Sequence, residues 1–186
     1  MKTISKILIL SILIFGLFGC QQETTSPSSN NQNQNNQNQN NQNQNNPNQT
    51  TGSEVFWNAS DYEVGTYTTE TVFGNITLIA SSKTAIDENS KKIDEIAFTK
   101  RLKLGGTGST SSAALKFTTT GKSDITVYCA SSSSTGTGRM LVLATADSII
   151  NDTNEAPLSA GKLVYSDVPA GTYYLYSSNS GINIYG

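Results

Sequence analysis

Short runs of alternating apolar and polar residues fill the chain from Glu54 to its last residue. They are rich in β-branched and aromatic residues, and clusters of Gly, Ser, Asn and Asp separate them, a pattern that indicates short strands joined by turns. The strand segments are 55–57, 62–73, 75–80, 95–104, 113–120, 124–130, 139–146, 162–166, 172–177 and 182–185. About 133 residues suffice for one domain, so we expect a single antiparallel β-sandwich of jelly-roll type over 54–186.

Two stretches interrupt this pattern. Residues 87–96 mix lysines with acids and offer no wide apolar stripe, so we expect a loop with at most one helical turn there. The segment 105–109, GGTGS, resembles a phosphate-binding loop only superficially, because no lysine follows the glycines and the next residues read as a strand rather than a helix. We therefore interpret it as a turn whose glycines permit positive φ.

Side-chain alternation along the strands predicts which residues face outward. In 98–104, Phe98, Leu102 and Leu104 share the core face, which leaves Arg101 and Lys103 together on the outer face. The same reasoning gives an outward set of Arg101, Lys103, Tyr128, Tyr174, Tyr176, Asn183 and Tyr185. Tyrosine rings, amides and cations suit sugar recognition, because rings stack on C–H surfaces while Arg and amides bind carboxylates or hydroxyls. A solvated strand face with cross-strand tyrosine pairs explains the same pattern.

The first nineteen residues have the organisation of a bacterial lipoprotein signal peptide. Lys2 and Lys6 precede an apolar run of about a dozen residues, which is shorter than the roughly 20 needed for a membrane-spanning helix. The run ends in Leu17-Phe18-Gly19-Cys20, which resembles a lipobox and predicts cleavage before a lipidated, palmitate-bearing Cys20. Gln21 after this cysteine favours the outer membrane or cell surface if the cell has two membranes.

A polar tether is expected over 20–53, between the lipid and the sandwich. Residues 30–46 consist of Asn and Gln alone, so they have no apolar surface to bury and are predicted to be disordered. Its position favours a spacer that lifts the domain off the membrane, although such tracts can also be prone to aggregation.

Composition excludes several functions. Removal of Lys2 and Lys6 with the leader leaves a net charge of −4, which argues against nucleic-acid binding. The chain has no histidine, so Cys129 lacks the usual activating base and is expected to be a small buried hydrophobe. No carboxylate spacing matches a calcium loop or a glycosidase pair, so we expect no metal, no cofactor and no enzymatic activity.

Four blocks of the chain form a recognisable series: Trp57–Tyr62 (WNASDY), Phe98–Ser109 (FTKRLKLGGTGS), Ile125–Leu141 (ITVYCASSSSTGTGRML) and Tyr173–Gly186 (YYLYSSNSGINIYG). Together they resemble a β-sandwich accessory module attached to bacterial pectate lyases, and the first block is similar to the module's opening strand. The resemblance implies a carbohydrate-binding role with pectic polymers as ligands, and Arg101, Arg139, Asn179 and Asn183 occupy its polar positions. The lyase β-helix is absent, so no catalytic residue transfers.

Two functions remain open from the sequence. The first is a surface-anchored, non-catalytic polysaccharide-binding module, with Arg101, Lys103, Tyr128, Arg139, Tyr176, Asn179 and Asn183 as candidate ligand-binding residues. The second is a structural or adhesive surface lipoprotein that binds a protein partner.

Overall fold

The computed structural model describes residues 53–186, so the signal peptide, Cys20 and all but the last residue of the tether lie outside the described residues. The described chain consists of twelve strands and one three-residue 3-10 helix, η1 (Ala59–Asp61). Within residues 53–186, no helix is long and apolar enough to cross a membrane.

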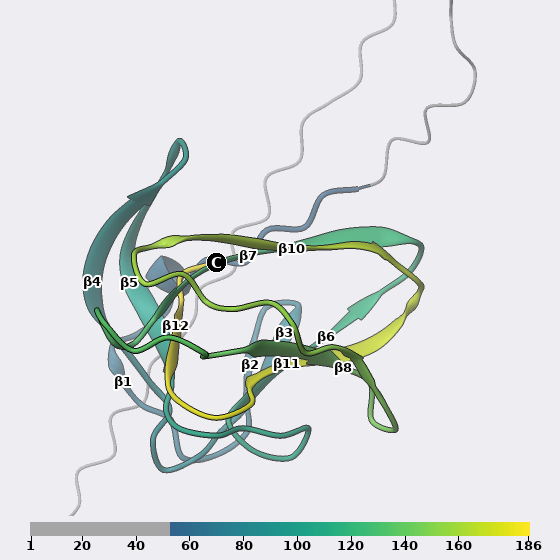
Figure 1. Ribbon diagram of the computed structural model, residues 1–186, viewed down its shortest axis with the longest axis horizontal. Coiled ribbons are helices and arrows are strands. Elements are labelled where there is room, and N and C mark those ends of the chain that lie inside the picture. The colour runs from purple at the N-terminus through teal and green to yellow at the C-terminus, as the bar shows by residue number, and fades with distance from the viewer. Residues whose placement is uncertain (1–52) are drawn as a thin grey trace, which may run out of the picture. The chain divides into compact units, whose positions relative to one another are not determined.

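Two antiparallel six-stranded sheets form the fold (Figure 1). Sheet A has the order β1-β4-β5-β12-β7-β10, and sheet B has the order β2-β3-β6-β11-β8-β9. The strands of sheet A are β1 (Gly65–Thr66), β4 (Ala85–Ile93), β5 (Ile96–Leu104), β12 (Ile182–Ile184), β7 (Ser123–Ser131) and β10 (Gly161–Val168). The strands of sheet B are β2 (Thr71–Phe73), β3 (Ile76–Ile79), β6 (Ala114–Thr119), β11 (Gly171–Ser177), β8 (Leu141–Ala144) and β9 (Ile149–Asn151).

The strand order confirms the expected jelly roll. From β5 onward the chain places β5, β12, β7 and β10 side by side in one sheet and β6, β11, β8 and β9 in the other, which is the double Greek-key arrangement. In Figure 1, β7 and β10 lie in the upper layer, and β6, β11 and β8 lie in the lower one.

The sandwich has two different ends. At one, which we call the loop end, the connections 105–113, 132–140 and 178–181 meet, as the pairs Ile182↔Leu104 and Ile182↔Ser131 require. At the other, which we call the mouth, the turns 120–122 and 169–170 lie together, because Val168 pairs with Ser123 and Gly171 pairs with Thr119.

The main core fills the space between the sheets, as alternation predicts. Leu102 and Leu104 of β5, Val127 and Cys129 of β7, and Leu175 of β11 all point into it and are buried. Ile182 and Ile184 of β12 join them. The inward assignments of these residues are therefore correct, whereas Phe98, which was assigned to the same face as Leu102 and Leu104, packs instead in a second apolar cluster with Tyr185 and Ala130.

Two residues that were predicted to be exposed are buried. Asn183 and Tyr185 were expected on an exposed face, but their exposed fractions are only 3% and 1%. The reason is that β12 lies between β5 and β7, so neighbours flank its outer side chains on both sides. Tyr185 also belongs to a second apolar cluster with Ile93, Phe98 and Ala130, which buries part of this face.

Four segments differ from the sequence prediction. Residues 62–73, expected as one strand, are divided between β1 of sheet A and β2 of sheet B. Residues 85–93, of which 87 onward was expected to be a loop, form β4 and pair with β5 along nearly its whole length. Strand β9 was not predicted, and it pairs with β8 over only a short stretch at the edge of sheet B. Residues 55–57 are not a strand, and η1 follows them where the resemblance implied an opening strand.

The glycine-rich stretch is a connection between the sheets, in agreement with its interpretation as a turn. It leads from β5 in sheet A to β6 in sheet B. Gly106 has a φ of +81°. A Cβ on Gly108 would lie 2.6 Å from the carbonyl oxygen of Ala113, so only glycine fits there without movement.

Candidate functional site

Arg101 and Lys103 lie together on the outer face of sheet A, where they share one carboxylate. The Arg101 Nε atom donates to Asp87 Oδ1 at 2.8 Å, and its Nη2 atom donates to Oδ2 at 3.3 Å. The Lys103 Nζ atom lies 3.3 Å from the same Oδ2 atom. We call Asp87, Arg101 and Lys103 the cation strip, because two positive charges face one negative charge.

The strip is half-buried, and its groups are coupled. Side-chain exposure is 24% for Arg101, 33% for Asp87 and 44% for Lys103. Burial opposes the charged form of Asp87, but hydrogen bonds and charges from Arg101 and Lys103 outweigh it and lower the pKa of the carboxyl group. The hydrogen bond to Asp87 raises the pKa of Arg101. Asp87 and Arg101 therefore stay ionised as a pair across the physiological range.

Register brings two further predicted residues to this face. Asn183 pairs with both Lys103 and Ala130, and its Nδ2 atom donates to the Ser131 carbonyl at 3.4 Å. Because that amide is buried and already bonded, it is not available to a ligand. Tyr128 is half-buried, and its ring lies 5.4 Å from the ring of Phe98.

Arg139, Asn179 and Tyr176 do not join the strip. The Arg139 Nη1 atom donates to the Ser132 hydroxyl at 2.6 Å and to the Gly181 carbonyl at 2.7 Å. The Asn179 Nδ2 atom donates to the Gly138 carbonyl at 2.6 Å. Both side chains therefore tie loops together at the loop end. Tyr176 belongs to β11 of sheet B, so the seven candidates do not form one surface.

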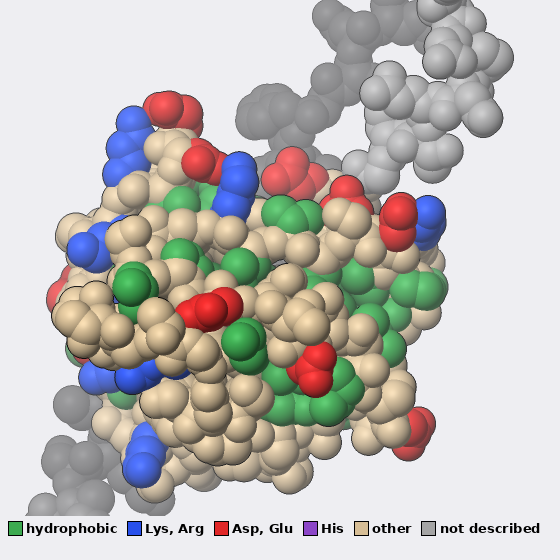
Figure 2. Space-filling view, in the orientation of Figure 1, with side chains coloured by type: hydrophobic (Ala, Val, Ile, Leu, Met, Phe, Trp, Pro, Cys, Tyr) green, Lys and Arg blue, Asp and Glu red, His purple; other side chains and the backbone are tan. Residues whose placement is uncertain are grey.

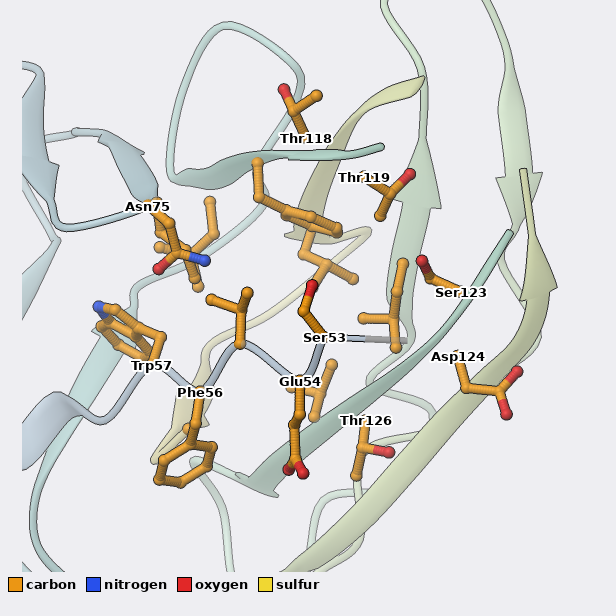
Figure 3. Close-up of a pocket in the computed structure, with 18 of the residues that line it drawn as sticks. Ser53, Glu54, Phe56, Trp57, Asn75, Thr118, Thr119, Ser123, Asp124 and Thr126 are labelled. Carbon is orange, nitrogen blue, oxygen red and sulfur yellow. The ribbon is translucent and has the colours of Figure 1, made fainter. Parts of the chain in front are cut away.

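A cavity of about 420 Å³ opens at the mouth, and sequence reasoning did not find it. It lies between β6 and β7 and is bordered on one side by residues 53–57 (Figure 3). Its apolar lining consists of Val55, Phe56, Trp57, Ile76, Leu115, Phe117, Ile125, Val127, Leu175 and Ile184. Its size falls in the range of small-molecule sites, about 300–1,000 Å³.

One sequence signal for the cavity exists in retrospect. Thr119 and Ser123 occupy inward-facing positions of β6 and β7, where a closed core would favour apolar residues. Alternation alone does not reveal that two sheets separate at one end, because that depends on the turns and on the segment that covers them.

In the described part of the chain, Cys129 is a free cysteine. It is fully buried in the main core, and this burial raises the pKa of its thiol to about 12. Within residues 53–186, no cluster of three or more Cys, Asp or Glu side chains is arranged to hold a metal ion.

The chain matches no protein-family model and no curated protein. The strip and the mouth are therefore the features of the described chain that bear on function.

Proposed function

We propose that this protein is a non-catalytic surface lipoprotein whose jelly roll binds an acidic, uronate-bearing polysaccharide at the cation strip. The observation that carries the proposal is the excess positive charge: Arg101 and Lys103 share the single carboxylate of Asp87. A uronate carboxylate would restore the balance. The resemblance to a pectate-lyase module supports pectic polymers as the ligand, and the lipobox at Cys20 supports display at the cell surface.

Lys103 is the better ligand contact of the two cations. Arg101 is held by two hydrogen bonds to Asp87, and a ligand would have to displace both. Lys103 makes one longer contact and is nearly twice as exposed. Its flexible stem lets the ammonium group turn to a ligand while the Arg101–Asp87 pair stays in place. We therefore assign Arg101 to positioning and Lys103 to binding.

Affinity electrophoresis in gels containing polygalacturonate tests this assignment. Lys103→Ala should weaken retention by about two- to fivefold, because exposed ion pairs contribute up to about 1 kcal/mol. Lys122→Ala is the matched control, since Lys122 is also an exposed lysine paired with a single aspartate, Asp167. Retention that is equal for the wild type and Lys103→Ala, with both folded, would show that the strip is not the site.

Lipid anchoring has its own test. Cys20→Ser should move the protein from the membrane fraction to the soluble fraction, because the only lipid acceptor in the predicted lipobox is lost. Metabolic labelling with a palmitate analogue checks the same residue directly. A variant that keeps both label and membrane association would refute the lipobox.

A second candidate function, binding of a protein partner, is favoured by one surface. Ile149 and Ile150 of edge strand β9 and Val164 of edge strand β10 are exposed by 58%, 48% and 46%. Figure 2 shows hydrophobic side chains gathered on the right-hand half of the molecule, where β10 and β8 lie in Figure 1. Exposed apolar patches on sheet edges commonly mark protein contacts. A stoichiometric partner that is lost with Ile150→Asp, together with no retention on any glycan, would select this function.

A further inference from the structure

The mouth cavity lies where β6 and β7 approach the turn 120–122, because side chains there do not fill the space between the two sheets. Along β7, inward-facing Cys129 and Val127 are buried, but Ile125 and Ser123 become partly exposed. Along β6, Leu115 is buried, whereas the inward-facing Phe117 is partly exposed. The floor of the cavity is thus an accessible extension of the main core.

The segment 53–57 forms a fixed wall of the cavity. The Phe56 ring packs 6.4 Å from Phe98 and 6.2 Å from Tyr128, both of sheet A. The Trp57 ring packs 5.9 Å from Tyr62 and 6.4 Å from Phe73 of sheet B. Because this wall is attached to both sheets, the cavity is preformed, as small-molecule sites usually are.

A few polar groups border the apolar floor. In Figure 3, Ser53 points into the space between the sheets, and the amide of Asn75 faces it from the β2–β3 turn. The Thr119 hydroxyl donates to the Pro169 carbonyl at 2.9 Å, and the Ser123 hydroxyl donates to the Gly121 carbonyl at 2.9 Å. The Thr119 oxygen also accepts from the Gly171 N–H at 3.2 Å, which leaves it one lone pair for a ligand, whereas the Ser123 oxygen keeps both.

The charge of the lining differs from that of the strip. No Lys or Arg is among the described residues that line the cavity, whereas Glu54 and Asp124 lie at its rim. In Figure 3, Asp124 points away from the space, so its carboxylate sets the local potential without filling the cavity. Lys122, in the turn at the mouth, is paired with Asp167, so Glu54 and Asp124 leave an excess of negative charge that an anionic ligand would meet, which disfavours a uronate here.

We infer that the mouth cavity is a second ligand site, which takes a neutral saccharide. An aromatic and aliphatic floor suits the C–H face of a sugar ring, and hydroxyls with an amide suit its hydroxyl groups. The absence of a cation from the described lining separates this ligand class from the acidic polymer proposed for the strip. The inference does not depend on the strip, because the two sites use different residues.

Trp57 provides the assay, because it is the single tryptophan of the chain and it lines the cavity. Its fluorescence is followed while the full-length protein is titrated with the neutral disaccharides cellobiose, maltose, lactose and galactobiose, and with digalacturonate as the charged comparison. We expect a saturable change with at least one neutral disaccharide and none with digalacturonate. No change with any neutral sugar, or an equal response to digalacturonate, would overturn the inference.

Two variants locate the response. Ile125→Phe adds volume inside the cavity and should weaken binding at least tenfold, whereas Leu158→Phe, at an exposed residue outside the lining, should not change it. If Ile125→Phe does not fold, Asn75→Ala at an exposed turn should still weaken binding about two- to tenfold, as loss of one hydrogen bond does. Unaltered binding in folded Ile125→Phe and in Asn75→Ala would contradict the site. If the wild type is not retained on polygalacturonate but responds to a neutral disaccharide, only the strip is refuted. If it is retained on polygalacturonate but no neutral disaccharide changes its fluorescence, only the cavity site is refuted.

Discussion

Replacement of Asp87 by Asn should change ligand affinity and fold stability in opposite directions. In the wild type the carboxylate neutralises one of two cations and stands beside the position that we assign to a uronate. Asn keeps the shape and can still accept a hydrogen bond from Arg101, but it removes the negative charge. Affinity for an acidic polymer should therefore rise while the stability of the fold falls.

Both effects can be estimated. A uronate carboxylate held by Lys103 would lie about 7 Å from Asp87 if the two acids flank the ammonium group, a separation comparable to two strand residues. Repulsion at that distance in water is about 0.6 kcal/mol, so its removal should strengthen binding by about threefold. Loss of the charge-assisted pair with Arg101 should reduce the free energy of unfolding by about 1 kcal/mol, a modest amount because all three groups are partly exposed.

The assay measures the dissociation constant for oligogalacturonate by calorimetry and the free energy of unfolding by urea titration. Asp147→Asn, a neutralised aspartate in the β8–β9 turn of sheet B, controls for the general effect of net charge. The gain in affinity should shrink when ionic strength rises to about 0.15 M, where the Debye length is about 8 Å. Equal or weaker affinity in folded Asp87→Asn would refute the assignment of Lys103 to binding, since the repulsion would then be absent.

Two other predictions concern the frame that holds the sites. Burial raises the pKa of Cys129 to about 12, so its neutral form is favoured in the folded state. The associated stability is intact below the unfolded pKa of about 9 and is lost as pH rises above it, by about 1.4 kcal/mol near pH 10. Urea titrations at about pH 7.5 and 10 should show a smaller alkaline loss in Cys129→Ala, and equal losses would contradict the burial argument. Gly108→Ala should destabilise the fold by about 1–3 kcal/mol, because its Cβ would meet the Ala113 carbonyl. Gly121→Ala, whose Cβ meets nothing within 4 Å, should change the melting temperature little, and equal melting temperatures for the two variants would be the contrary result.

Alternation predicted most of the fold because inward positions must be apolar when one face of a sheet is buried. The strand β4 escaped this rule, since its sequence carries charged and polar residues at most positions. Its partner β5 stabilises it through backbone pairing, and a bulge between Glu88 and Lys91 shifts its register, so no strict period of two survives. Tertiary pairing decides such a segment, and a single sequence does not show that pairing.

The same missed strand explains what was missing from the predicted site. Arg101 and Lys103 were placed correctly on one face, but their partner Asp87 was assigned to a loop. Without β4, the two cations seemed free to bind a ligand. With β4 in place, one of them has an internal partner, and the binding role passes to Lys103.

The polar residues at which the resemblance led us to expect ligand contacts are largely satisfied inside this protein. Arg139 and Asn179 hold loops together, and Asn183 is buried against the Ser131 carbonyl. Residues used in this way preserve the connections of a jelly roll whatever the domain binds. Similarity at these positions therefore bears on the fold. The choice of ligand depends instead on groups whose charge or hydrogen-bonding capacity is not satisfied within the protein. Lys103 at the strip and the polar rim of the mouth are two such groups in the described chain, and their opposite electrostatic character is why we propose two ligand classes rather than one.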